Sequence, residues 1–246
     1  MKLSSAEAKS SSQTARATLV LREMIIDGHF RPNERIREIP LAAQLDVSRI
    51  PLRLALERLA HEGLLEIRPT RGFVVQQFTT GDIYDAIELR GILEGAAARL
   101  ASERLRDSRD LAALREASAE MDALLRNRKL ALEAFTKYIE LNAKFHSALI
   151  DLCRSRILKR AIKQACALPF ASPSAFLLKQ SEGSPDLFFI ALDQHRGIIE
   201  AISNRESMRA EFLAREHARL ARRNLDVALD NRELLKSVRG AKLIQI

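Results

Sequence analysis

Three histidines in the later part of the chain have a spacing that could hold a metal ion. His146 lies four residues after Asn142, so the two side chains point to one side of the same expected helix. His195 and His217 lie on two later helical stretches. Three imidazoles and an amide oxygen that converge inside a helical bundle could bind a first-row divalent metal. Spacing alone favours the ordinary alternative, in which each histidine is a core or surface residue.

A second group of residues has the chemistry of a DNA contact. Arg49 and Arg53 lie one turn apart near the start of a short expected helix, and Ser48 precedes it as an N-cap. Arginines there can bind phosphates or the O6/N7 edge of guanine, and Ser48 can offer its hydroxyl and N–H to a phosphate. Arg71 and Gly72 lie at the tip of an expected hairpin, where arginine suits a narrow minor groove and glycine permits close backbone approach. An isolated arginine pair would instead indicate a solvated helix face.

The elements around these arginines predict a winged helix-turn-helix of three helices and a short β-hairpin. Periodic apolar residues and turn signals indicate helices over 14–27, 39–45 and 49–61, and strands over 64–67 and 72–75. Asp46-Val47-Ser48 is the expected turn between the second and third helices. The arginine pair therefore lies at the start of the second helix of the motif, which favours DNA binding over a solvated face.

From Thr79 onward the sequence pattern is helical. The first helix is expected to run from Thr80 to about Leu105. Further helical stretches are expected near 108–127, 129–153, 155–168, 185–203 and 206–228. Proline and glycine interrupt the pattern at 169–185, and the stretch 170–184 could be a loop near a pocket. The fold class is therefore mostly α, with a C-terminal all-α bundle of about six to seven helices.

Bulk composition excludes several classes of protein. The chain has 246 residues and a formal net charge of +8, which is spread along its length and so supports DNA binding only weakly. Apolar runs stay below the roughly 18 residues of a membrane span, and the small polar N-terminus lacks the apolar core of a secretory signal. The two cysteines, Cys153 and Cys166, are expected to be buried thiols, which fits a cytoplasmic protein.

The first part of the chain resembles the DNA-binding domain of the GntR family of regulators. The resemblance covers residues 19–76 and is carried by the run Ala42–Leu56, by Leu59, by Glu62-Gly63-Leu64 and by Arg71-Gly72-Phe73-Val74. Asp46 and Asn33 stand where the family usually has glycine, and both residue types tolerate a left-handed backbone. Leu54 replaces the usual glutamate of the recognition helix, which bears on the operator sequence.

Residues 80–228 resemble the FCD effector domain that follows the DNA reader in one branch of that family. Arg90 with Glu94, Asn142 to His146 with Leu149, His195 with Ile198 and Ile199, and His217 carry the resemblance. It implies a metal held by Asn142, His146, His195 and His217, with zinc favoured over nickel or manganese. Asn142 stands where the family usually has aspartate, so the site loses one negative charge but keeps an oxygen ligand. Arg90 is the candidate for binding an effector carboxylate, with a structural ion pair as its alternative.

Together these features predict a ligand-responsive transcriptional regulator rather than an enzyme. The expected partners are a near-palindromic double-stranded operator, a small carboxylic acid and a second copy of the chain, with repression the expected action and no membrane partner. The expected organisation is a flexible tail (1–13), a winged helix-turn-helix (14–78), a helical effector-binding and dimerisation domain (79–230) and a C-terminal extension (231–246). Two alternatives stay open: a bundle that only dimerises or senses without metal, and a metal-dependent hydrolase. The second is disfavoured because the sequence has no HExxH, GxSxG or P-loop motif.

Overall fold

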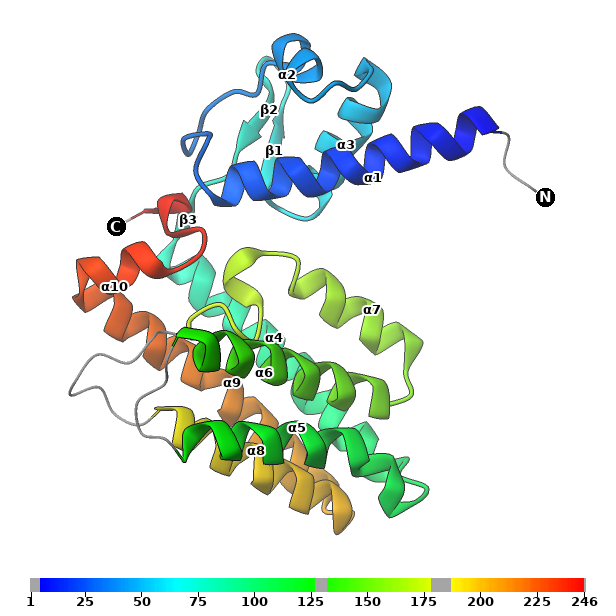
Figure 1. Cartoon of the computed structure of the whole chain (residues 1–246), viewed down its shortest axis with the longest axis vertical. Coiled ribbons are helices and arrows are strands. Elements are labelled where there is room, and N and C mark those ends of the chain that lie inside the picture. The colour runs from blue at the N-terminus through cyan, green and yellow to red at the C-terminus, as the bar shows by residue number, and fades with distance from the viewer. Residues whose placement is uncertain (1–4, 127–131, 178–186, 246) are drawn as a thin grey trace. The chain divides into compact units, whose positions relative to one another are not determined.

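The computed structural model describes residues 5–126, 132–177 and 187–245, and the chain divides into two compact units (Figure 1). The winged-helix unit contains the residues up to Asp82 together with 167–169 and 239–246. The helical unit contains 83–166 and 170–238. Within the described residues, no helix is both long and apolar enough to cross a membrane.

The winged-helix unit has the three helices and the hairpin that the sequence predicts. They are α1 (Ser5–Ile26), α2 (Glu38–Gln44), α3 (Arg49–His61), β1 (Leu65–Arg68) and β2 (Gly72–Val75). The two strands pair antiparallel with Leu65 opposite Val75. Apolar residues from α1, α3 and the start of β1 make a core whose members Leu21, Leu56 and Leu64 have no exposed surface. Burial of this apolar surface holds α3, the second helix of the motif, in place.

Two turns of this unit have left-handed backbone at residues other than glycine. Asn33 has φ 63° and Asp46 has φ 49°. Asparagine and aspartate bear this conformation better than other residues with a Cβ. The turns before α2 and before α3 therefore keep their shape without a glycine at position 33 or 46.

The start of α1 differs from the expected flexible tail over 1–13. The helix begins at Ser5, so that expectation is wrong from Ser5 onward, and residues 1–4 lie outside the described residues. Five of the nine residues over 5–13 are alanine, glutamate, lysine or glutamine, which are good helix formers, and the other four are serine. Extending a helix that packing has already nucleated costs little, so α1 continues toward the N-terminus.

The end of the chain is also structured. The helix α10 (Arg232–Ser237) and a 3-10 turn (Ala241–Leu243) precede β4 (Ile244–Gln245). This strand pairs in parallel with β3 (Phe78–Thr79). The sequence pattern predicts no strand from Thr79 onward, so this pair differs from the expectation. Two residues are too few to give a periodic signal, and the partner strand lies at the far end of the sequence, so local pattern could not predict this pair.

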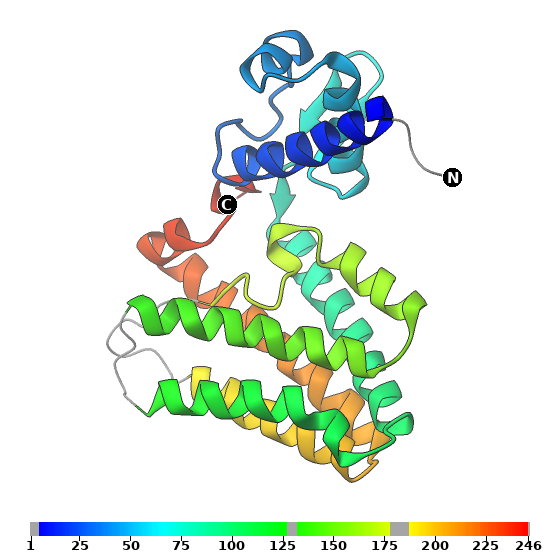
Figure 2. The same cartoon turned by 45° about the vertical axis from the view of Figure 1, so that its right-hand side comes forward.

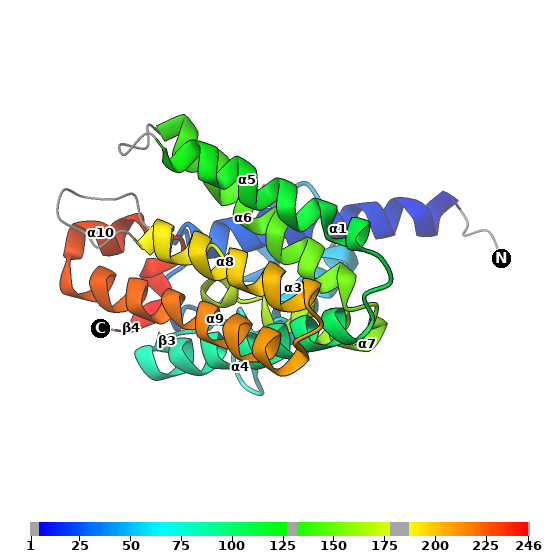
Figure 3. The ribbon, with the colours of Figure 1, turned by 90° about the horizontal axis from the view of Figure 1, so that it is seen from below.

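The helical unit confirms the expected bundle. Its helices are α4 (Thr80–Glu103), α5 (Ala112–Leu125), α6 (Leu132–Leu152), α7 (Arg156–Ala165), α8 (Leu187–Ser203), α9 (Ser207–Asp230) and α10, with 3-10 turns at Ser108–Leu111 and Pro169–Ala171. α5 packs against α6 and α8, and α8 packs against α9, as the view from below shows (Figure 3). The helices α4, α5, α6, α8 and α9 each turn buried residues to a shared core, whereas Ile162 of α7 packs in a smaller cluster with Ala97 and Cys153.

Two glycines let α4 and α9 approach closely. A Cβ on Gly95 would lie 2.6 Å from Cγ of Arg215 and 3.0 Å from the backbone oxygen of Glu211. A Cβ on Gly91 would lie 3.0 Å from Cβ of Ala218. The Gly91–Gly95 spacing therefore marks close packing between helices. This packing sets the distance between α4 and the face of α9 that carries His217.

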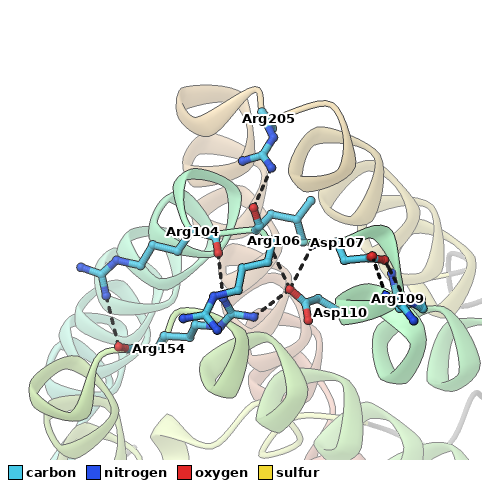
Figure 4. A network of polar contacts seen from close by, with 8 residues as sticks. Arg104, Arg106, Asp107, Arg109, Asp110, Arg154 and Arg205 are labelled. Atoms are coloured by element: carbon cyan, nitrogen blue, oxygen red, sulfur yellow. Dashed lines mark hydrogen bonds and ion pairs between the residues drawn. The ribbon is translucent and has the colours of Figure 1, made fainter.

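One end of the bundle is tied by arginines that bind carbonyls and a carboxylate (Figure 4). Arg154 donates to the backbone oxygen of Arg104 (3.0 Å) and to Asp110 (2.7 Å), and Arg104 donates back to the oxygen of Cys153 (2.9 Å). Arg205 donates to the backbone oxygen of Leu105 at 2.6 Å. These bonds join the turn after α4 to the turns after α6 and α8. They satisfy carbonyls at helix ends that have no partner within the helix.

Candidate functional site

The three histidines predicted from spacing meet in the core of the helical unit. His146 comes from α6, His195 from α8 and His217 from α9. Nε2 of His217 lies 3.0 Å from Nε2 of His195 and 3.3 Å from Nε2 of His146. Four ligands at 2.0–2.1 Å in a tetrahedral arrangement put neighbouring nitrogens about 3.3 Å apart. These two distances are close to that value, and the ligand atoms of all three histidines lie within 4.8 Å of one another, so the group could hold a single ion.

Helix periodicity places these rings in the interior. Each histidine continues the buried stripe of its own helix: Asn142 and Leu149 flank His146, and Leu192 and Ile198 flank His195. The ring of Phe145 stacks on His195 with centroids 3.9 Å apart and planes 28° apart. Three core positions carry polar imidazole rings where apolar side chains would pack without the cost of burying polar atoms. This favours a ligand-binding role for the histidines over simple packing.

Burial keeps the imidazoles of His195 and His217 in the form that binds metals. Removal from water, followed by the charge of neighbouring histidines, lowers the pKa of His195 well below its ordinary value. The same causes, burial first and His146 next, lower the pKa of His217 to about 3. Neutral imidazole is the metal-ligating form, so at neutral pH these two rings need lose no proton to bind an ion.

Two side chains lie beside the outer nitrogens of the histidine rings. Oε1 of Gln194 lies 3.1 Å from Nδ1 of His217 in a hydrogen bond, which orients that ring so that Nε2 points to the proposed metal position. Oε1 of Glu94 lies 3.3 Å from Nδ1 of His146, within ion-pair distance but without the alignment of a hydrogen bond. From the sequence, Glu94 is expected only as part of the Arg90–Glu94 pattern, and Gln194 is not expected at the site. The position of Gln194 directly before His195 carried no signal, because its contact is with a different helix.

Arg90 is buried in an ion pair. Its Nη1 lies 3.1 Å from Oε2 of Glu94, and Nη2 donates to the backbone oxygen of Ala218 at 3.4 Å. Arg90 is 2% exposed and Glu94 is 1% exposed. Burial opposes ionisation of Glu94, but attraction to His146 and Arg90 outweighs it and lowers its pKa to about 2. In this structure Arg90 makes the structural ion pair that was the alternative to effector binding. Glu94 in turn places α4 next to His146.

Asn142 uses its amide to hold a neighbouring segment. Nδ2 donates to Oγ of Ser174 (3.1 Å) and to the backbone oxygen of Pro173 (3.4 Å). Among the described residues, no hydrogen bond joins Asn142 to the three imidazoles. Pro173 and Ser174, in the stretch expected to form a loop, therefore lie against Asn142 on α6. Residues 178–186 of that stretch lie outside the described residues.

The predicted DNA contacts lie on exposed parts of the winged-helix unit. Ser48 occupies the N-cap of α3, but its side chain makes no cap hydrogen bond, so the expected cap bond is absent. Arg49 is exposed, and Arg53 pairs with Glu57 on the surface at 3.3 Å. Arg71 and Gly72 form the hairpin tip, where Gly72 has φ 68° and open space beside it. These side chains therefore stay accessible to a partner.

The winged-helix unit and the helical unit each match a known family model. The family model "Bacterial regulatory proteins, gntR family" matches residues 13–75, and the FCD domain model matches residues 85–220, more than half of the chain. The chain belongs to the GntR family. Its FCD domain is the bundle that holds His146, His195 and His217, and its GntR domain is the winged helix-turn-helix.

Two curated relatives of this GntR protein are regulators. The Nta operon transcriptional regulator of Aminobacter aminovorans is 38% identical over 140 residues, which are 57% of this chain and 63% of that protein. The HTH-type regulator YdhC of Bacillus subtilis is 34% identical over 143 residues, 58% of this chain and 62% of that protein. The match thus spans less than two thirds of either relative. Both relatives are named as transcriptional regulators and neither as an enzyme, which favours a regulator over the hydrolase alternative.

Solved structures support the fold of the GntR protein. Escherichia coli McbR/YncC superposes with a TM-score of 0.60 at 21% identity, covering 89% of this chain and 98% of that one. The Listeria monocytogenes protein Lar superposes with a TM-score of 0.59 at 21% identity, covering 87% of this chain and 97% of that one. At this identity the likeness concerns the fold alone.

Proposed function

We propose that this GntR regulator senses a small carboxylic acid with the help of a divalent metal and, as a homodimer, represses genes by binding a near-palindromic operator. The observation that carries the sensing half is the meeting of His146, His195 and His217, with Nε2 atoms 3.0 and 3.3 Å apart. The three rings are buried and grouped within the reach of one ion. Imidazole ligands favour zinc, with nickel and manganese as alternatives.

Asn142 is the fourth proposed ligand. An amide oxygen is a weaker ligand than a carboxylate and brings no charge. Its Nδ2 is engaged by Ser174 and Pro173, which leaves the amide oxygen as the atom that can serve a metal. A site with three neutral imidazoles and an amide leaves the positive charge of the ion uncompensated. An anionic effector would offset that charge, which supports a carboxylic acid as the sensed molecule.

Arg90 is the proposed effector contact. In the structure it pairs with Glu94, so binding an acid would require the guanidinium to share or exchange this partner. A bidentate contact with a carboxylate is a strong interaction for arginine in a dry site. Because Arg90 and Glu94 both lie on α4, a change of partner within this ion pair would also alter α4 when the acid binds.

The DNA-binding half is proposed to use α3 and the hairpin tip. Arg49 and Arg53 with Ser48 would lie along the major groove, and Arg71 with Gly72 would approach the minor groove. Two such units in a homodimer would meet successive grooves of a near-palindromic operator. Repression is supported by the similarity to the Escherichia coli transcriptional repressor RspR, which is 26% identical over 172 residues.

The decisive experiment is metal analysis of the purified chain with a thermal-shift screen of small carboxylic acids, repeated after chelation. We expect about one ion per chain and a chelator-sensitive shift with one class of acid. His195→Ala should lose both the ion and the shift. Arg196→Ala is the matched control, because Arg196 is the next residue on α8 but pairs with Asp122 at the surface.

Absence of metal from the chain, both as purified and after incubation with zinc, would overturn the metal-assisted proposal. The contacts of Asn142 with Ser174 and Pro173 favour a second candidate in that event, a bundle that senses without metal or only dimerises. An acid that shifts the chelated protein would identify the metal-free sensor, and no shift with any acid would indicate a dimerisation domain.

A further inference from the structure

The last residues of the chain are built into the winged-helix unit, although they follow the helical unit in sequence. Residues 239–246 group with the residues up to Asp82. Within this C-terminal segment, β4 pairs with β3 so that Ile244 lies opposite Phe78. Leu243 and Ile244 are buried. These residues lie beyond the FCD match, which ends at residue 220. The described part of the segment is therefore an integral piece of the DNA-binding unit.

The C-terminal segment also holds the end of α1. Nζ of Lys242 donates to the backbone oxygen of Asp27 at 2.9 Å, and Arg239 pairs with Glu23. A lysine at the carbonyl end of a helix both satisfies an unpaired oxygen and complements the helix dipole. Gly28, with φ 76°, ends the helix directly under this lysine: a Cβ there would lie 2.1 Å from Cδ of Lys242. The contact depends on a glycine at that position.

The same segment continues from the helix that carries His217. α9 ends at Asp230, and α10 begins at Arg232 after a single residue. Oδ1 of Asn231 caps α10 by accepting from the N–H groups of Glu233 and Leu234 at 3.0 and 3.3 Å. Val238 at the end of α10 is buried. Capped helices with a one-residue joint transmit a displacement that a long flexible linker would absorb.

We infer that residues 239–245 are a built-in coupling element, through which a change at His217, in the middle of α9, alters the end of α1 and so the DNA-binding unit. The alternative is that the segment only completes the fold of the winged-helix unit. In that case its removal would loosen α1 without changing how the unit responds to the histidine site. The inference rests on the proposed function in one respect, the use of zinc as the signal.

The test is hydrogen exchange on the full-length protein, metal-free and zinc-loaded, compared with a chain that ends at Val238 and with Lys242→Met. In the wild type we expect zinc to slow exchange in α8 and α9 and also at the last turn of α1, whose amides at Asp27 and Gly28 bond to Glu23 and Ile25. In both variants the slowing in α8 and α9 should persist and the effect on α1 should be lost. Gln245→Ala is the matched control, since this side chain is exposed on the same segment.

Other outcomes decide the inference as well. A zinc effect on α1 that persists in the chain ending at Val238 would overturn it and direct attention to residues 167–169, the other late segment of the winged-helix unit, where Leu168 lies against Gly63. If zinc slows exchange in α8 and α9 of the wild type but leaves exchange at the end of α1 unchanged, the inference is also overturned.

If zinc does not slow exchange in α8 and α9, the proposed metal site fails, and thermal unfolding then tests the coupling by itself. We expect one cooperative transition in the wild type and two transitions in the chain ending at Val238. The same number of transitions in both chains would overturn the inference.

Discussion

Oε1 of Glu94 lies 3.3 Å from Nδ1 of His146, while Nε2 of the same ring faces His217 at 3.3 Å. The imidazole thus lies between a carboxylate within ion-pair distance on one side and the proposed metal position on the other. Such a carboxylate favours the tautomer with hydrogen on Nδ1 and raises the basicity of Nε2. Glu94 is itself held by Arg90, so the buried group runs from α4 to α6 and α9.

Glu94→Gln should weaken zinc binding about 10- to 100-fold, the usual cost of removing a carboxylate behind a ligating histidine. Glutamine keeps the size and an acceptor oxygen but removes the charge. Calorimetric titration with zinc measures the effect, and circular dichroism checks that the variant is folded. Glu88→Gln, on the same helix but at the surface with Arg215, should bind zinc as the wild type does. Equal affinity in the wild type and Glu94→Gln would refute the role of Glu94.

Asn142→Asp should strengthen zinc binding by about tenfold or more, because it supplies a charged oxygen ligand in place of a neutral one. The change costs the donor that Asn142 gives to Ser174 and Pro173, so a small loss of stability should accompany it. Competition with a fluorescent zinc chelator measures the affinity. Asn142→Ala should bind zinc more weakly than the wild type. If the aspartate and alanine variants bind alike, residue 142 is not a ligand.

The metal-free protein should become less stable as the pH falls. The pKa of His217 is about 3 in the folded protein, against an ordinary value of 6.5, so the unfolded chain binds more protons between these values. The free energy of unfolding therefore decreases as the pH drops from 6.5 toward 3. Glu94, whose pKa falls from 4.5 to about 2, adds a further loss below pH 4.5. Urea unfolding across this range measures the slope, which His217→Gln should flatten. A slope unchanged by that variant would contradict the assignment.

Arg49→Ala should weaken operator binding by about 1–3 kcal/mol. If Arg49 contacts a phosphate, the slope of the logarithm of the binding constant against the logarithm of the salt concentration should also fall by about one. Binding to a duplex selected from a random library by the wild-type protein, measured at several salt concentrations, tests this. Arg58→Ala is the matched control: it lies on the same helix, about 180° around from Arg49, and pairs with Glu62. Loss of affinity in Arg58→Ala, with none in Arg49→Ala, would mean that a different face of α3 meets DNA.

Gly95→Ala should destabilise the helical unit by about 1–3 kcal/mol, because the added methyl group overlaps Arg215 and the backbone of Glu211. Gly197→Ala is the contrasting change. A Cβ there meets Cδ1 of Leu213 at an ordinary 3.4 Å, so the better helix propensity of alanine should stabilise α8 by up to about 1 kcal/mol. Urea unfolding of both variants measures the difference. Equal stabilities would mean that α4 and α9 are not packed as closely as described.

Helix positions were predictable because their signal is local. The expected helix over 206–228 is α9 (Ser207–Asp230), and the expected strand over 72–75 is β2 (Gly72–Val75). Each depends on apolar periodicity, caps and breakers within one stretch of sequence. Left-handed turns at Asn33 and Asp46 were predictable for the same reason, because the conformational tolerance belongs to the residue itself.

The sequence by itself determined the two kinds of unit, the helices that carry the arginines and histidines, and the residue types that could meet a metal or DNA. Only the tertiary structure decided which distant groups touch: Glu94 with His146, Gln194 with His217, Arg90 with Glu94, and β4 with β3. The reason is physical. Secondary structure follows from interactions among neighbouring residues, whereas these contacts depend on how helices pack and where the chain returns, which local periodicity does not encode.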